Sequence, residues 1–120
     1  MAIVIPVFRV FDYPKTIEFY VNWLGFTINW EYKPEGSPFY LQASLRGATI
    51  DLSEHHGECS PGARATIAGF EGLEGYLELL RSKNYKYMNP GLERVPWKEN
   101  TLSVTVIDPF YNRIIFNEDL

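Results

Sequence analysis

The residues best suited to chemistry lie on a predicted β-hairpin near the middle of the chain. Arg46-Gly47 is typical of a two-residue turn between strands over 39–45 and 48–53. Such a turn places Gln42 opposite Asp51, so that both side chains share one face of the hairpin with Tyr40. This face is polar for a sheet, whereas the other face is apolar and is predicted to pack on helices. We therefore predict that the polar face lines a binding site.

Two arginines and five aromatic residues are candidates to complete this site. Arg9 is expected on the same face from the first strand and Arg64 from the second half of the chain. The chain is 16% aromatic, with 3 Trp, 8 Tyr and 8 Phe, and aromatic faces bind planar or cationic ligands by stacking. The candidate wall residues are Trp30, Tyr32, Phe39, Tyr40 and Trp97. Two alternatives stay open for the polar face: simple solvation, or a structural ion pair between Asp51 and Arg64.

A second group of reactive side chains, Glu54, His55, His56 and Cys59, follows the hairpin. Adjacent residues of a strand point to opposite faces, so His55 and His56 are not expected to chelate one ion. We expect both imidazoles to bond to backbone or water in a polar connector. Cys59 is expected to be an inert loop thiol, because no Ser-His-Asp order, phosphate loop or CxxC motif accompanies it.

The elements that must position these residues form a repeated pattern. A strand over 1–10 precedes a helix that begins at Asp12 and ends at Gly25, and strands over 26–32, 39–45 and 48–53 follow. After a connector, the same order recurs as a strand over 64–69, a helix over 72–83 and strands over 85–88, 101–107 and 113–118. A constant offset of about 59 residues relates the helices of the two halves.

The predicted fold class is therefore α+β, built from two βαβββ modules over about 1–54 and 64–120 with a connector over 55–63. Both modules belong to one domain of 120 residues. One such module leaves one face of its sheet bare. Two modules or two chains must therefore cover each other or enclose a cavity.

Composition excludes several classes of protein. The formal net charge of −4 argues against a nucleic-acid partner. No apolar run reaches the roughly 20 residues that span a bilayer, and no secretory signal is seen, so no membrane partner is expected. One cysteine cannot form an internal disulfide, and this favours a cytoplasmic location.

The order of short motifs resembles one known superfamily. The opening motifs are Phe8-Arg9-Val10, Asp12, Ile17-Glu18-Phe19-Tyr20 and Leu24-Gly25-Phe26, and the closing ones are Asp108-Pro109, Asn112-Arg113 and Phe116. Together they resemble the vicinal-oxygen-chelate superfamily, which includes glyoxalase I, extradiol dioxygenases and bleomycin-resistance proteins. Tyr111 stands where that pattern usually has glycine. The resemblance implies a cup-shaped mixed sheet and a homodimer. Further motifs resemble the bleomycin-resistance branch, namely Ser53-Glu54-His55-His56-Gly57, Pro61-Gly62 and Pro96-Trp97.

The metal positions that the resemblance implies fall at Ile5, Asp51, Arg64 and Ile115. Only Asp51 can be a ligand, and a protein-held divalent ion usually needs about three protein ligands. We therefore expect no metal and no cofactor.

The leading hypothesis is a metal-independent protein that binds and sequesters a small aromatic or cationic compound, such as a glycopeptide antibiotic, without catalysis. In it, Arg9, Gln42, Asp51 and Arg64 orient the ligand and the aromatic residues stack on it. One alternative is an enzyme of the same superfamily, with a relocated metal or with Asp51 as general base. Another is a protein whose cup only stabilises a dimer.

Overall fold

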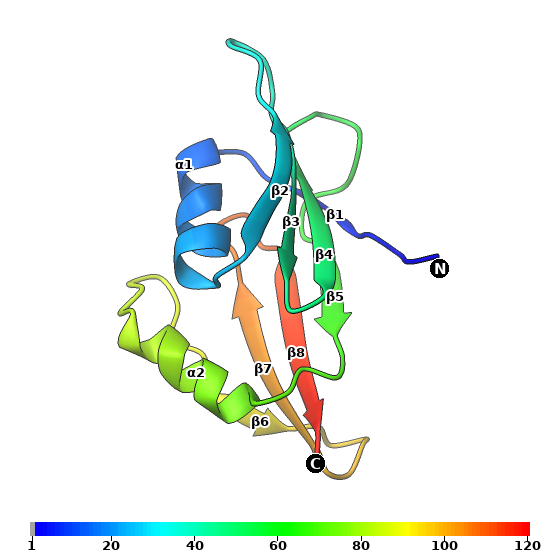
Figure 1. Cartoon of the computed structure of the whole chain (residues 1–120), viewed down its shortest axis with the longest axis vertical. Helices are drawn as coiled ribbons and strands as arrows, with labels where there is room; N and C mark the ends of the chain where they lie inside the picture. Colours follow the sequence, from blue (N-terminus) through cyan, green and yellow to red (C-terminus); the bar gives the residue numbers. More distant parts are fainter. Residues whose placement is uncertain (1) are drawn as a thin grey trace. The chain divides into compact units, whose positions relative to one another are not determined.

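The computed structural model describes residues 2–120, which form two compact units (Figure 1). The first unit contains residues up to Ala63 together with Asp108–Asn112, and the second contains Arg64–Ile107 and Arg113–Leu120. Each unit has a four-stranded sheet, and the element order is βαβββ followed by βαβββ. The predicted α+β class and the predicted order of elements are confirmed.

The sheet of the first unit holds the predicted hairpin. Its strands are β1 (Val7–Arg9), β2 (Thr27–Tyr32), β3 (Tyr40–Leu45) and β4 (Ala48–Ser53), in the order β1-β4-β3-β2. Leu45 pairs with Ala48 and Gln42 with Asp51, which is the predicted register. Arg46 and Gly47 both have positive φ, as a tight hairpin turn requires. β1 is shorter than the strand expected over 1–10.

The helical segment of the first unit begins as predicted but winds differently. Asp12 caps it, since its side chain accepts a hydrogen bond from Lys15 N at 2.9 Å. The short helix α1 (Tyr13–Thr16) then continues as the π-helical segment η1 (Ile17–Trp23), in which backbone bonds run from each residue to the fifth before it. This segment places three aromatic side chains in the core, namely Phe19, Tyr20 and Trp23.

A β-bulge in β2 decides which way two aromatic residues point. Ile28 pairs with Ala43 but Trp30 pairs with Gln42, so Asn29 is the extra residue. Strict alternation along the strand would put Trp30 and Tyr32 on the same face as Ile28. The extra residue instead moves Trp30 and Tyr32 to the polar face of the sheet, opposite Gln42 and Tyr40.

The second unit has strands β5 (Arg64–Ile67), β6 (Leu92–Arg94), β7 (Thr101–Ile107) and β8 (Arg113–Asp119), in the order β5-β8-β7-β6. Helix α2 (Leu73–Ser82) lies alongside this sheet (Figure 1) and buries Leu73, Tyr76, Leu77 and Leu80. The strand predicted over 85–88 is wrong, since β6 begins only at Leu92. Pro90 has no N–H to donate to a ladder, so pairing starts beyond it.

A buried carboxylate organises the loop Asp108–Asn112 within the first unit. Asp108 is 3% exposed and accepts hydrogen bonds from Tyr20 Oη at 2.6 Å and from the backbone N–H groups of Phe110 and Asn112, both at 2.8 Å. Asn112 Nδ2 donates to Asp108 Oδ2 at 2.8 Å and to the backbone oxygen of Arg9 at 2.7 Å. These bonds fix the loop beside the end of β1. Among residues 2–120, no helix is long and apolar enough to cross a membrane.

Candidate functional site

The polar face of the first unit is organised around Asp51. Tyr40 Oη donates to Asp51 Oδ2 at 2.6 Å, and Gln42 Nε2 donates to Asp51 Oδ1 at 3.0 Å. Gln42 and Tyr40 lie on β3, and their positions follow from the hairpin register. Both carboxylate oxygens therefore have a neutral donor, and the negative charge of Asp51 is held in a fixed position.

A row of hydrogen bonds orients Gln42 from the other side. Asn29 Nδ2 donates to Gln42 Oε1 at 3.2 Å and to Ser44 Oγ at 2.7 Å, and Ser44 Oγ lies 3.2 Å from Thr49 Oγ1. Sequence reasoning missed Asn29, because its contribution depends on the bulge. The row fixes the Gln42 amide so that its NH₂ group points at Asp51.

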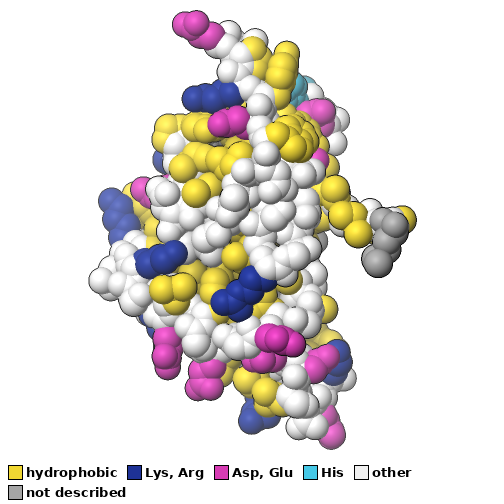
Figure 2. All heavy atoms as spheres, in the orientation of Figure 1, with side chains coloured by type: hydrophobic (Ala, Val, Ile, Leu, Met, Phe, Trp, Pro, Cys, Tyr) yellow, Lys and Arg dark blue, Asp and Glu magenta, His cyan; other side chains and the backbone are white. Residues whose placement is uncertain are grey.

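A stacked pair of aromatic rings lies beside the Asp51 carboxylate. The rings of Trp30 and Tyr40 are stacked, with centroids 5.6 Å apart and planes within 4° of each other. Trp30 is 47% exposed and Tyr32 is 61% exposed. Figure 2 shows apolar side chains over the upper part of the molecule, where Figure 1 places α1 and β2. A flat aromatic surface thus lies beside a fixed negative charge, and this combination suits a planar or cationic ligand.

The pKa of Tyr40 is raised well above its usual value, mainly by burial and then by the hydrogen bond to Asp51. The phenol therefore stays protonated at physiological pH and remains a donor.

We expect Asp51→Asn to lower the pKa of Tyr40, because the substitution removes the carboxylate that disfavours the phenolate. Tyrosine ¹³Cζ shifts measured across an alkaline titration check this. Glu54→Gln is the control, and an unchanged Tyr40 titration in Asp51→Asn would contradict the geometry.

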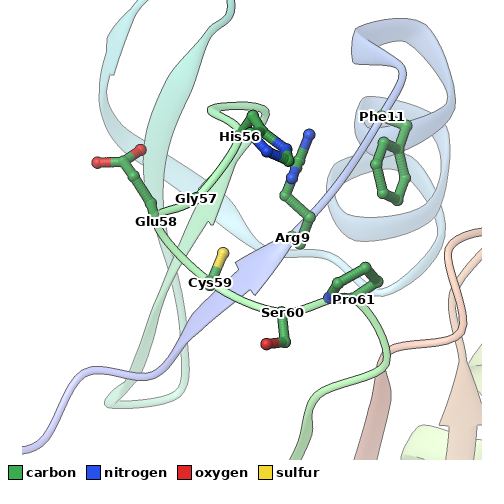
Figure 3. Close-up of a pocket in the computed structure, with 8 residues that line it drawn as sticks. All are labelled: Arg9, Phe11, His56, Gly57, Glu58, Cys59, Ser60 and Pro61. Carbon is green, nitrogen blue, oxygen red and sulfur yellow. The ribbon is translucent and has the colours of Figure 1, made fainter.

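Arg9 lies on the same face but one row away from Asp51. Val7 is the residue of β1 that pairs with Asp51, whereas Arg9 pairs with Ser53, which in turn pairs with Tyr40. Arg9 borders a hollow of about 670 Å³ at the end of β1 (Figure 3). The predicted residues that the structure brings onto one face are thus Arg9, Trp30, Tyr32, Tyr40, Gln42 and Asp51.

Three predicted site residues lie elsewhere. Phe39 is only 1% exposed and packs edge to face on Tyr13 at 5.0 Å, so its ring is part of the core and the expected wall position is corrected. Arg64 begins β5 and is exposed, and Trp97 lies between β6 and β7 and is 82% exposed. Both belong to the second unit, and their part in a ligand site stays a prediction.

The donor set does not fit the divalent metal of the superfamily's enzymes. On β1 the residue paired with Asp51 is Val7, not the expected Ile5, and on β5 the residue paired with Ile115 is Thr66, not the expected Arg64. Neither valine nor threonine supplies the charged ligand that a divalent ion needs at these positions. Asp51 is the one carboxylate at these positions, and it already accepts two hydrogen bonds. Among residues 2–120, no group of three His, Cys, Asp or Glu side chains is placed to hold a metal ion.

The connector after β4 contains the reactive side chains singled out in the sequence. Ser53 Oγ donates to Glu58 Oε1 at 2.6 Å, and His55 Nδ1 lies 3.8 Å from the same oxygen. His56 is exposed. Burial raises the pKa of the Cys59 thiol, which keeps it protonated at neutral pH.

Comparison with known proteins gives one family and many similar folds. The family model described as glyoxalase superfamily protein matches residues 1–120. A putative glyoxalase family protein from Bacillus anthracis is 17% identical with a TM-score of 0.69, over 100% of this chain and 96% of that one. A bleomycin-binding protein complexed with bleomycin is 14% identical with a TM-score of 0.71, over 100% of both chains. A bleomycin resistance determinant encoded on the transposon Tn5 is 15% identical with a TM-score of 0.73, over 99% of this chain and 98% of that one. Comparison with curated proteins gives no match.

Proposed function

Because the chain belongs to the glyoxalase superfamily, we propose that it acts as one of the superfamily's binding proteins rather than as a metal enzyme. It binds and sequesters a small planar or cationic molecule on the polar face of β2, β3 and β4. No covalent step and no metal are involved. The homodimer and the cytoplasmic location expected from the sequence are part of this proposal.

The observation that carries the proposal is the stacked pair of Trp30 and Tyr40 beside the fixed carboxylate of Asp51. A planar ligand ring extends this stack on the exposed side of Trp30, and a cationic group on the ligand faces Asp51. Each such aromatic contact contributes about 0.5–2 kcal/mol of binding free energy. Because Tyr40 and Gln42 already hold Asp51 in place, little conformational entropy is lost when the ligand binds.

Similar folds support this class of ligand. One structure of the same fold is a bleomycin-binding protein in complex with bleomycin. Bleomycin-type glycopeptides and planar cationic antibiotics are therefore the first compounds to test.

Titration calorimetry of protein treated with a chelator tests the proposal. We expect saturable heat with at least one compound of a panel of metal-free bleomycin and planar cationic antibiotics, because the site needs no metal. Heats equal to those of buffer across the panel would contradict the proposal.

Elemental analysis tests the enzymatic alternative in the same preparation. Protein purified without chelators is expected to contain no stoichiometric metal, because Asp51 is the one possible ligand at the family's positions. One tightly bound zinc, nickel, manganese or iron ion per subunit would instead favour a metal-dependent enzyme.

A further inference from the structure

The hollow beside Arg9 has the features of an anion site. It is lined by Arg9 and Phe11 at the end of β1 and by six consecutive residues of the connector, 56–61 (Figure 3). These elements all belong to the first unit. We propose that this hollow binds an oxyanion group, a carboxylate or a phosphate, through the Arg9 guanidinium.

The Arg9 side chain is a charged donor without an acceptor among residues 2–120. Its Nε is shielded from solvent and has no hydrogen-bond partner among residues 2–120. A buried donor left unpaired is destabilising, and more so when the group is charged. An oxyanion in the hollow would pair with the part of the guanidinium that lines it, and the planar fork of a guanidinium suits two parallel bonds to a carboxylate or phosphate.

The neighbouring acid, Glu58, is engaged by other residues. Glu58 is the acidic residue that lines the hollow, yet its carboxylate accepts from Ser53 Oγ at 2.6 Å and lies 3.8 Å from His55 Nδ1. In Figure 3 this carboxylate points away from the Arg9 side chain. In the part of the chain that the structure describes, Arg9 has no ion pair, so its charge is available to a ligand.

Arg9 is held in place by an aromatic ring and a backbone hydrogen bond. Its guanidinium carbon lies 4.6 Å from the centre of the Phe11 ring, and the Phe11 ring packs on Phe110 at 5.9 Å. The Arg9 backbone oxygen accepts from Asn112 Nδ2. The Arg9 side chain therefore loses little conformational freedom when an anion binds. The hollow of about 670 Å³ also has room for an anionic group on a larger molecule.

Cys59 gives a direct readout, because it lines the hollow and is the one cysteine in the sequence. We expect inorganic phosphate to slow alkylation of Cys59 by iodoacetamide by a factor of about 1 + [phosphate]/Kd, relative to sodium chloride of equal ionic strength. The same additions should shift the Nε–H resonance of Arg9 in ¹H–¹⁵N spectra. Arg9→Gln should lose the protection and Arg9→Lys should lose most of it, whereas the exposed control Arg113→Gln should keep it.

Two further measurements distinguish a free anion from an anionic group on a larger ligand, and the hollow beside Arg9 from the aromatic site at Trp30. Tighter binding of phenyl phosphate than of inorganic phosphate assigns the anionic group to a larger aromatic ligand, and equal binding assigns it to a free anion. Trp30→Ala should retain the phosphate effect, so a failure of the aromatic site is distinct from a failure of this one. No protection and no Arg9 shift in the unaltered protein, or equal protection in Arg9→Gln, would overturn the proposal.

Discussion

Asp108→Ala is expected to lower the free energy of unfolding by at least about 3 kcal/mol, because it leaves several buried donors without an acceptor. The phenol of Tyr20 and the backbone N–H groups of Phe110 and Asn112 all donate to this carboxylate. Both Tyr20 and Asp108 are almost fully buried, so water cannot replace the lost acceptor. Urea denaturation at neutral pH, followed by circular dichroism, measures the loss.

Two further variants make this result specific. Tyr20→Phe removes one donor and keeps the others, so we expect a smaller loss of about 1–2 kcal/mol. Asp119→Ala removes an exposed carboxylate that contacts Lys98 and Thr101, and it should change stability much less. Equal decreases in the free energy of unfolding of Asp108→Ala and Asp119→Ala would show that the Asp108 network does not stabilise the first unit.

Trp30→Ala is expected to weaken binding of the compound identified by calorimetry about tenfold, since it removes a stacking surface worth about 1–2 kcal/mol. Trp30 is half-exposed, so its loss should leave the fold intact. Trp30→Phe keeps an aromatic ring and should retain most of the affinity. The dissociation constant from titration calorimetry is the measurement.

The control for this prediction is Tyr87→Ala, which removes an exposed aromatic ring of the second unit. It should leave the affinity unchanged. Trp97→Ala tests the wall position that the sequence predicted for Trp97. An affinity lost in Trp97→Ala but kept in Trp30→Ala would move the ligand away from the first sheet.

Local signals in the sequence predicted the hairpin and the helix ends well. Arg46-Gly47 determines the register of β3 and β4 through turn geometry alone, and so it correctly paired Gln42 with Asp51. Asp12 likewise caps its helix with its own side chain, and Gly25 has the positive φ that its position requires. The order βαβββ was predictable for the same reason, because most elements carry their own boundary residues.

Features that depend on non-local pairing were not predictable. The bulge at Asn29 exists because β2 pairs with β3, and this single extra residue places Trp30 and Tyr32 on the polar face, which strict alternation from Ile28 does not predict. Phe39 was misplaced for a related reason, since its burial depends on contact with Tyr13. The bond between Tyr20 and Asp108 joins residues 88 positions apart, and no local pattern indicates it.

We propose that the sheet face carrying Trp30, Gln42 and Asp51 binds the ligand. Chemical-shift mapping in ¹H–¹⁵N spectra, with metal-free bleomycin added to the unaltered protein, tests it most directly. We predict that the largest shifts occur at the Trp30 indole N–H and the Gln42 side-chain amide. Shifts centred on the second unit, or no shifts at a saturating concentration, would contradict the claim.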